Sequence, residues 1–367
     1  MKNRMKLFIG FTLLAGFVIW RTLVAPDPGQ TVSILAWPTS FSPTLIQEFT
    51  EKTGINVIYD NTPSDEISET KALAGHSGYD VINITAHPFV PHLVSAGALQ
   101  KLDRDRIPNL SLQDPKLLSN FQSEEERRSV GLYYWGTTGI GLSSIALDRL
   151  PPDADTNSAA MVFDPQFAKK IGECGLTFLY SATDVIPLAL LYLGADPNDL
   201  SDRALERVVR LFDSLRPYIR KFDNTGYKQA LAQGDICAAV GWSEAIYLSN
   251  ELMKKNGSKD SIQYIIPQEG GLIWMSGLVI PTDAPHQKNA EDFVNFVLSK
   301  EAGAALTNAV KIASAVPSSR ELLSQDVLDN PITFPKDMSK LPYFKGAVSS
   351  DELKRLDRAW ERIKTGL

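Results

Sequence analysis

The segment after residue 29 alternates short β-rich apolar runs with helix-forming runs. Thr31 to Trp37 (TVSILAW) is the first apolar run, and Ser42-Pro43 then supplies a helix N-cap and a first-turn proline. Gly54 is placed to end that helix, and Ile55 to Tyr59 (INVIY) is the next predicted strand. Such alternation predicts an α/β fold with a mostly parallel sheet that is covered by helices on both faces.

The same pattern continues along the chain and predicts two lobes. A helix over Glu66 to Ala74 and a strand over Val81 to Thr85 complete the first set, and Gly131 to Ser144 (GLYYWGTTGIGLSS) suits a crossover between lobes. A domain commonly takes about 100–200 residues, so the 367 residues suggest two domains, or three. We expect lobe 1 to be 30–134 plus 256–302 and lobe 2 to be 135–255 plus 303–367. Further strands are expected near Leu176, into Trp242, over Ser261 to Pro267 and over Leu272 to Pro281. Further helices are expected over Val185 to Leu193, Asp202 to Leu215, Gly226 to Gln233, Ala290 to Leu298, Ala302 to Val310 and Leu353 to Lys364.

The first residues have the pattern of a targeting segment. Lys2, Arg4 and Lys6 precede an uncharged stretch from Leu7 to Trp20, which is 14 residues long. That length fits the apolar region of a signal peptide and is short for a membrane span. We expect residues 1–29 to direct export, either as a cleaved signal peptide or, alternatively, as an uncleaved N-terminal anchor.

Export determines how the two cysteines of the sequence are interpreted. Cys174 and Cys237 each stand just before a strand-like run, and neighbouring parallel strands would bring them together. In an oxidising compartment such a pair is typical of a structural disulfide rather than of a reactive thiol. We therefore predict a Cys174–Cys237 disulfide bond.

Charge and motif content exclude several classes of function. The net charge of −6 argues against a nucleic-acid partner, which would require a basic surface. His87 and His92 lie five residues apart, which is not one face of a helix, so we interpret them as loop or surface histidines. No closely spaced His/Cys cluster and no GxSxG, GxxxxGK[ST] or strand-linked GxGxxG motif occurs. We therefore expect no metal, no cofactor and no enzymatic activity.

Several short runs follow one another along nearly the whole chain beyond the predicted signal. They are Trp37 after a strand, Thr53-Gly54-Ile55-Asn56-Val57, Gly78-Tyr79-Asp80-Val81, Tyr134-Trp135-Gly136-Thr137-Thr138-Gly139-Ile140-Gly141, Cys174-Gly175, Tyr192-Leu193-Gly194-Ala195-Asp196-Pro197-Asn198, Leu215-Arg216-Pro217, Gly234-Asp235-Ile236-Cys237, Gly241-Trp242 and Arg358-Ala359-Trp360. In this order they resemble the polyamine-binding proteins of bacterial ABC transporters, and most closely the putrescine-type receptors. The resemblance implies a two-lobed periplasmic binding fold of type II, with a ligand cleft between lobes that close on a hinge. It also implies a monomer in the periplasm.

The resemblance implies a site for a cation. Trp37 and Trp242 match site positions of the family directly, and Trp274 stands where the family has an aromatic residue. Each cation–π contact stabilises a bound ammonium by about 0.5–2 kcal/mol, so we expect these three side chains to form aromatic walls. Thr85 stands where the family places a hydroxyl that touches the ligand. Trp37 and Thr85 also stand at the carboxyl ends of predicted strands, where α/β sheets bind ligands.

The acidic positions of the family are altered in this chain. The loop after the first Trp is Pro38-Thr39-Ser40, whereas the family has Ser-Asp-Tyr, so Thr39 replaces an acid. Ala245 and Ser276 replace two further aspartates of the family. Asp184 matches an acidic position, and Glu244 adds an acid in the second lobe. We expect Pro38, Thr39, Asp184, Glu244 and Ser276 to contact the ligand together with the Trp residues and Thr85.

This acid content leaves three interpretations of the ligand open. The ligand has one cationic end and a neutral or anionic other end, or it is a polyamine held chiefly by Trp faces, Glu244 and Asp184, or affinity has been lost. A buried cation without a carboxylate partner is costly, which is why the missing acids matter.

Two further functions stay open beside delivery of an amine to an ABC permease. The first is a sensor that docks on a membrane signalling receptor without transport, because a partner need only prefer the closed lobes. The second is an exported enzyme, for which the sequence offers no motif.

Overall fold

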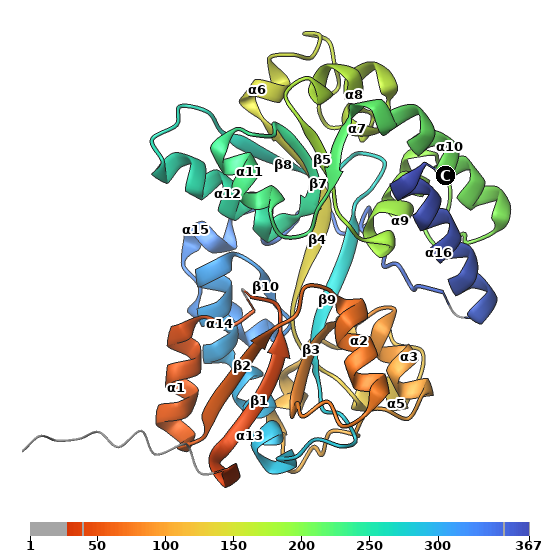
Figure 1. The fold of residues 1–367 in the computed structure, drawn as a ribbon. Helices are drawn as coiled ribbons and strands as arrows, with labels where there is room; N and C mark the ends of the chain where they lie inside the picture. The colour runs from red at the N-terminus through yellow and green to blue at the C-terminus, as the bar shows by residue number, and fades with distance from the viewer. Residues whose placement is uncertain (1–27, 39, 348, 367) are drawn as a thin grey trace, which may run out of the picture.

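The computed structural model describes residues 28–38, 40–347 and 349–366 of the chain. The predicted signal over residues 1–29 lies outside this part, apart from its last two residues. Within the described part, no helix combines the length and the apolar character that a membrane crossing needs. The chain forms two lobes joined by long central strands (Figure 1).

Lobe 1 is built on three parallel strands at one end of the sheet. β1 (Thr31–Ala36) lies between β2 (Asn56–Asn61) and β3 (Val81–Thr85) and pairs with both in parallel, which confirms the predicted βαβ start. Ser42 caps the first helix, and Gly54 ends it with a φ of 74°, in the left-handed region that glycine favours. The helices of this lobe are α1 (Pro43–Thr53), α2 (Asp65–Ala74), α3 (Phe89–Ser95), α4 (Pro115–Leu118), α5 (Glu124–Arg128), α13 (Gln287–Val297) and α14 (Lys300–Val310).

Lobe 2 repeats this arrangement at the other end of the sheet. β5 (Leu176–Phe178) lies between β6 (Ile219–Phe222) and β7 (Ala238–Trp242) and pairs with both in parallel. β5 and β7 lie where the apolar runs predicted them or beside those runs, whereas β6 was not predicted. The helices of this lobe are α6 (Ser144–Leu147), α7 (Ala160–Phe163), α8 (Pro165–Gly172), α9 (Ala182–Tyr192), α10 (Asp202–Leu215), α11 (Tyr227–Gln233), α12 (Ser243–Lys255) and α16 (Ser350–Thr365).

Two long strands connect the lobes and correct the expectation of a mostly parallel sheet. β4 (Gly131–Ser143) and β9 (Leu272–Val279) pair antiparallel with each other and run through both lobes (Figure 1). β9 also pairs antiparallel with β3, and β4 pairs antiparallel with β7, β8 (Ile262–Ile265) and β10 (Ala313–Ser314). A chain that passes to the second lobe and returns must run in opposite directions, so parallel pairing is confined to the two ends. The predicted crossover is thus itself a buried strand.

The hydrophobic core is divided between the lobes, and its packing places the lobe boundaries at other residues than the sequence predicted. Leu306 and Val316 pack into the core of lobe 1, in one cluster with Phe49 and Phe293. Ile262 packs into the core of lobe 2. The sequence-based boundaries placed residues 303–316 in lobe 2 and 256–265 in lobe 1. The packing differs because α14 follows α13 onto the same face of lobe 1, while β8 pairs with the part of β4 that lies in lobe 2.

The predicted disulfide is present. Cys174 and Cys237 are bonded, with their Cα atoms 5.6 Å apart. They precede β5 and β7, which are parallel neighbours, so the sheet places both cysteines at its amino-terminal edge. Ligands of α/β sheets bind at the opposite ends of the strands, the carboxyl ends.

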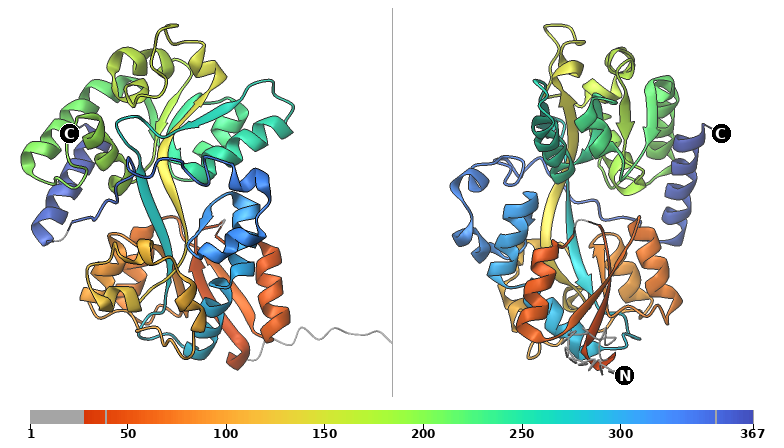
Figure 2. Two further views of the ribbon diagram at one scale, coloured as in Figure 1. Left: turned by 180° about the vertical axis from the view of Figure 1, so that it is seen from behind. Right: turned by 60° about the vertical axis from the view of Figure 1, so that its left-hand side comes forward.

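The C-terminal segment crosses between the lobes beside the central strands (Figure 2). Tyr343 forms a β-bridge with Ile273 of β9, and its carbonyl oxygen accepts a hydrogen bond from Asn198 Nδ2 at 3.3 Å. The Asn198 side-chain oxygen accepts one from the Lys345 backbone at 2.7 Å. The crossing thus touches both lobes. α15 (Gln325–Leu328) lies earlier in the same C-terminal region, and α16 then packs on α10.

Candidate ligand-binding site

A cavity of about 210 Å³ lies between the two lobes, at the carboxyl ends of their parallel strands. Trp37 follows β1 and Trp242 ends β7, and both line the cavity. Their ring centroids are 5.8 Å apart with an interplanar angle of 67°, so two aromatic side chains from opposite lobes meet edge to face. Tyr343 and Phe344 of the C-terminal crossing also line the cavity.

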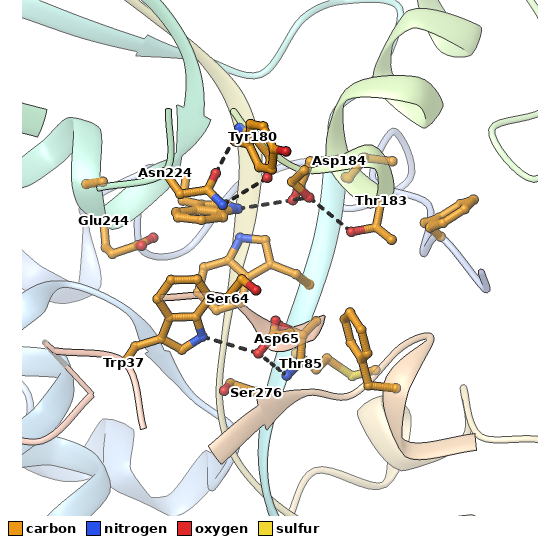
Figure 3. A pocket seen from close by; sticks show the side chains of 18 of the residues that line it. Trp37, Ser64, Asp65, Thr85, Tyr180, Thr183, Asp184, Asn224, Glu244 and Ser276 are labelled. Carbon is orange, nitrogen blue, oxygen red and sulfur yellow. Dashed lines mark hydrogen bonds between the residues drawn. The ribbon is translucent and has the colours of Figure 1, made fainter. Parts of the chain in front are cut away.

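Four carboxyl groups line this cavity, each from the first turn of a helix, and Glu66 is the one that directly follows Asp65 in α2. Asp65 begins α2, Asp184 lies in the first turn of α9, and Glu244 lies in the first turn of α12. The partial positive charge of a helix N-terminus favours a carboxylate at each of these places. Figure 3 shows Asp65 on the lobe 1 side and Asp184 and Glu244 on the lobe 2 side of the cavity.

Asp184 is held by three side-chain donors. Its Oδ1 accepts a hydrogen bond from Thr138 Oγ1 at 2.5 Å, and its Oδ2 accepts bonds from Ser181 Oγ at 2.7 Å and Trp242 Nε1 at 3.4 Å. Burial raises the pKa of Asp184, and these hydrogen bonds act in the opposite direction. The indole of Trp242 is therefore oriented by the acid of its own lobe.

Glu244 keeps an unsatisfied oxygen inside the cavity wall. Its Oε2 atom is buried and has no hydrogen-bond partner, although the residue as a whole is only partly buried. Burial raises the pKa of Glu244 to about 7, while the positive charge of Lys228, which also lines the cavity, works against that rise. Trp274 Nε1 is a second buried and unpartnered polar atom of this wall. Buried polar atoms of native proteins normally have partners, so these two orphans, together with the unpartnered Nδ1 of the cavity residue His87, mark a place for a ligand.

Asp65 was not predicted from the sequence. It is 9% exposed, and its Oδ1 accepts hydrogen bonds from Trp37 Nε1 and from the Thr85 backbone N–H, both at 3.3 Å (Figure 3). Burial raises the pKa of Asp65 to about 7, against the hydrogen bonds from Thr85 and Trp37. An acid one residue after the N-cap Ser64 looks like ordinary helix capping, which hides it. The available signal was its place four residues beyond β2, the parallel neighbour of β1.

The structure brings most of the predicted site residues together. Thr39 lies outside the described residues. Ser276 pairs in register with Thr85 across β9 and β3, and its hydroxyl accepts a hydrogen bond from Asn83 Nδ2 at 2.6 Å. The predicted residues that line this same cavity are Trp37, Pro38, Thr85, Asp184, Trp242, Glu244, Trp274 and Ser276.

The two histidines singled out in the sequence lie in different surroundings. His87 lines the cavity and stacks on Phe121 with ring centroids 4.7 Å apart, and burial lowers its pKa to about 4, so its ring is neutral. His92 lies on α3, where Nδ1 meets Glu69 at 3.1 Å and Nε2 meets the Ala347 carbonyl oxygen at 3.0 Å. Among the described residues, no group of three or more His, Cys, Asp or Glu side chains is arranged to hold a metal.

Comparison with known proteins gives one consistent result. The family described as bacterial extracellular solute-binding protein matches residues 44–335. The chain is 32% identical to the putrescine-binding periplasmic protein SpuD of Pseudomonas aeruginosa, over 100% of both chains. It is 30% identical to the putrescine-binding periplasmic protein PotF of Escherichia coli, over 92% of both.

Solved structures show the same fold. The spermidine/putrescine ABC transporter substrate-binding protein PotD of Streptococcus pneumoniae superposes with a TM-score of 0.73 at 22% identity, covering 91% of this chain and 98% of that one. The Tp0655 lipoprotein of Treponema pallidum superposes with a TM-score of 0.76 at 21% identity, covering 91% and 99%. At these identities the similarity concerns the two-lobed architecture.

Proposed function

The chain belongs to the bacterial extracellular solute-binding protein family, and we propose that it captures a small amine, a polyamine or a related compound, between its lobes for an ABC permease. In this role the protein binds and releases its solute without chemical turnover. The permease would recognise the closed form that the ligand stabilises, as a partner that prefers one conformation does.

One observation carries the proposal, namely the buried and unpartnered Oε2 of Glu244 in a cavity walled by Trp37 and Trp242. A ligand ammonium would satisfy this oxygen, and the indole faces would stabilise the same positive charge by about 0.5–2 kcal/mol for each contact. An ammonium taken out of water needs such partners, because an unpaired buried charge is costly. The relatives named for putrescine support the same class of ligand.

We further propose that the protein works in the periplasm. The predicted export signal, the Cys174–Cys237 disulfide and the periplasmic location in the names of its relatives all support this placement. The proposed partners are thus a small amine and an inner-membrane permease, with the protein acting as a monomer.

Isothermal titration calorimetry with putrescine, agmatine and spermidine tests the binding step. We expect at least one of these amines to bind, and Glu244→Gln to weaken that binding at least tenfold because the neutral amide cannot pair with an ammonium. Glu251→Gln on the same helix is the matched control, since Glu251 lies on the surface and pairs with Lys254 at 2.9 Å. Absence of binding by all three amines would contradict the proposal.

The delivery step needs a cellular experiment. Deleting the gene should abolish uptake of the radiolabelled amine that the purified protein binds, and the wild-type gene should restore uptake. Unchanged uptake together with a lost transcriptional or motile response to the amine would favour docking on a signalling receptor instead.

A further inference from the structure

Asp65 occupies a place in the cavity that the resembling family does not predict, and it has no counterpart among the expected site residues. We propose that Asp65 is the ligand-contacting carboxylate of lobe 1, which pairs with the cationic group of the bound amine on that side of the cleft. This inference rests on the proposed function and concerns the residue that determines affinity for the amine. We thus place the ligand-binding acid of lobe 1 on α2, whereas the sequence led us to look for it in the loop after β1 and in β9.

The position of Asp65 is set by three strands that meet at the cavity. α2 starts four residues after β2, which brings its first turn beside the end of β1, and Trp37 Nε1 donates to Asp65 Oδ1 at 3.3 Å. The Thr85 backbone N–H at the end of β3 donates to the same oxygen at 3.3 Å. Both donors are themselves cavity residues, so they fix the carboxyl group at the cavity wall (Figure 3).

The location of Asp65 explains how lobe 1 can bind a cation without an acid at position 276. Thr85 is paired in register with Ser276, so Asp65, bonded to Thr85, lies at the same corner of the cleft. The Ser276 hydroxyl accepts a hydrogen bond from Asn83 and carries no charge. Asp65 therefore supplies a buried negative charge at this corner, whereas its neighbour Glu66, which also lines the cavity, is exposed.

Charge balance across the cavity supports the same role. Lobe 2 contributes Asp184 and Glu244, and Lys228 adds a positive charge near Glu244. Lobe 1 contributes the exposed Glu66 and the buried Asp65, and Asp65 is the one that Trp37 and Thr85 hold at the cavity wall. A cation held between carboxylates of both lobes favours their closed arrangement, because each lobe gains an ion pair only when they approach. The unpartnered Trp274 Nε1 and Glu244 Oε2 independently mark this cavity as a ligand site.

A pair of substitutions separates contact with the ligand from a purely structural role. In Asp65→Asn, the amide oxygen can still accept the bonds from Trp37 and Thr85, so the wall keeps its geometry and loses only its charge. In Asp65→Ala, both bonds and the charge are lost. Asp60→Asn is the control, because Asp60 lies on β2 outside the cavity, on the surface, where it accepts a bond from Tyr79.

The test is calorimetric titration of the purified mature chain with putrescine, agmatine and spermidine. We expect Asp65→Asn and Asp65→Ala each to weaken binding of the amine that wild type binds at least tenfold, with Asp60→Asn within twofold of wild type. Asp65→Asn within twofold of wild type would overturn the inference, also when Asp65→Ala loses binding, since Asp65 would then only position Trp37. In that case binding by wild type and its loss in Glu244→Gln would leave the proposed function standing. If wild type binds none of the three amines, both fail.

Discussion

The two walls of the cleft bring their carboxyl groups to the cavity by different routes. On lobe 2, Asp184 and Glu244 lie in the first turns of α9 and α12, the helices that follow β5 and β7. On lobe 1, the turn after β1 supplies Trp37, whereas the acid comes from the turn after β2. Glu244 thus lies two residues from Trp242, whereas Asp184 and Asp65 lie 58 and 28 residues from the Trp whose N–H donates to them.

The walls nevertheless share one arrangement. Trp242 donates its indole N–H to Asp184, and Trp37 donates its indole N–H to Asp65, so each lobe pairs one Trp with one acid. The acid that accepts from a Trp can therefore come from a neighbouring strand-to-helix connection, since parallel pairing brings the ends of neighbouring strands together. The predictions that follow test how far the two walls are equivalent, from the largest effect on binding to the smallest.

Removal of a charge from each wall should have the largest effect. Asp65→Asn with Glu244→Gln should weaken amine binding at least a hundredfold, because the two groups lie on opposite walls and their separate losses of at least tenfold should add in free energy. Calorimetry of both single variants and the double variant measures this. A double variant no weaker than either single one would show that the walls do not act independently.

Loss of an aromatic wall should have the next largest effect. Trp242→Ala should weaken binding at least tenfold, because it removes a cation–π contact of up to about 2 kcal/mol and the N–H that orients Asp184. Trp242→Phe keeps an aromatic face and loses only the hydrogen bond, so its effect should be smaller. Equal losses in both variants, measured by calorimetry, would assign the role of Trp242 to its hydrogen bond rather than to its ring.

The pH dependence of binding should follow the two raised carboxyl pKa values. Asp65 and Glu244 both have pKa values of about 7, so lowering the pH from 8 to 6 protonates them and weakens their attraction for an ammonium. Affinity should therefore fall by up to about tenfold per pH unit for each group below its pKa. Calorimetry between pH 6 and pH 8 measures the slope, and Asp65→Asn should reduce it. A flat profile would contradict the role of these acids as ionised ligand partners.

The stability of the ligand-free protein should change with pH in the opposite direction. Because these two pKa values are raised on folding, the folded state binds more protons than the unfolded state between roughly pH 4 and pH 7. Their contribution to the free energy of unfolding therefore rises as the pH falls through 7. A comparison of thermal midpoints of wild type and the Asp65→Asn, Glu244→Gln double variant isolates this contribution, which the double variant should lack.

The sequence was sufficient for those parts of the molecule that depend on local rules. Ser42, Pro43 and Gly54 define the limits of α1, and the alternation of apolar and helical runs gives the parallel strands at both ends of the sheet except β6. Of the two central antiparallel strands, β9 was predicted and β4 was missed, since β4 is buried along its whole length and its Gly- and Thr-rich sequence shows no alternation. Such a segment becomes a strand only through the partners on its two sides.

The site shows the same limit more sharply. Trp37, Trp242, Asp184 and Glu244 were found because each lies close to a strand end or matches a family position. Asp65 was missed because its role depends on contacts with Trp37 and Thr85, which lie 28 and 20 residues away. Only the register of β1 with its two neighbours brings these groups together.

The disulfide should have the smallest effect on binding although it has a large effect on folding. Cys174→Ala with Cys237→Ala removes a crosslink between positions 63 residues apart, which should lower the free energy of unfolding by about 2–4 kcal/mol. Affinity should stay within twofold of wild type, because both cysteines precede their strands while Trp242 and Asp184 lie beyond the opposite ends. Urea unfolding and calorimetry on the same preparation measure the two quantities. A tenfold loss of affinity at unchanged stability would show that the crosslink holds the lobe 2 wall in place, a device that lobe 1 lacks among its described residues.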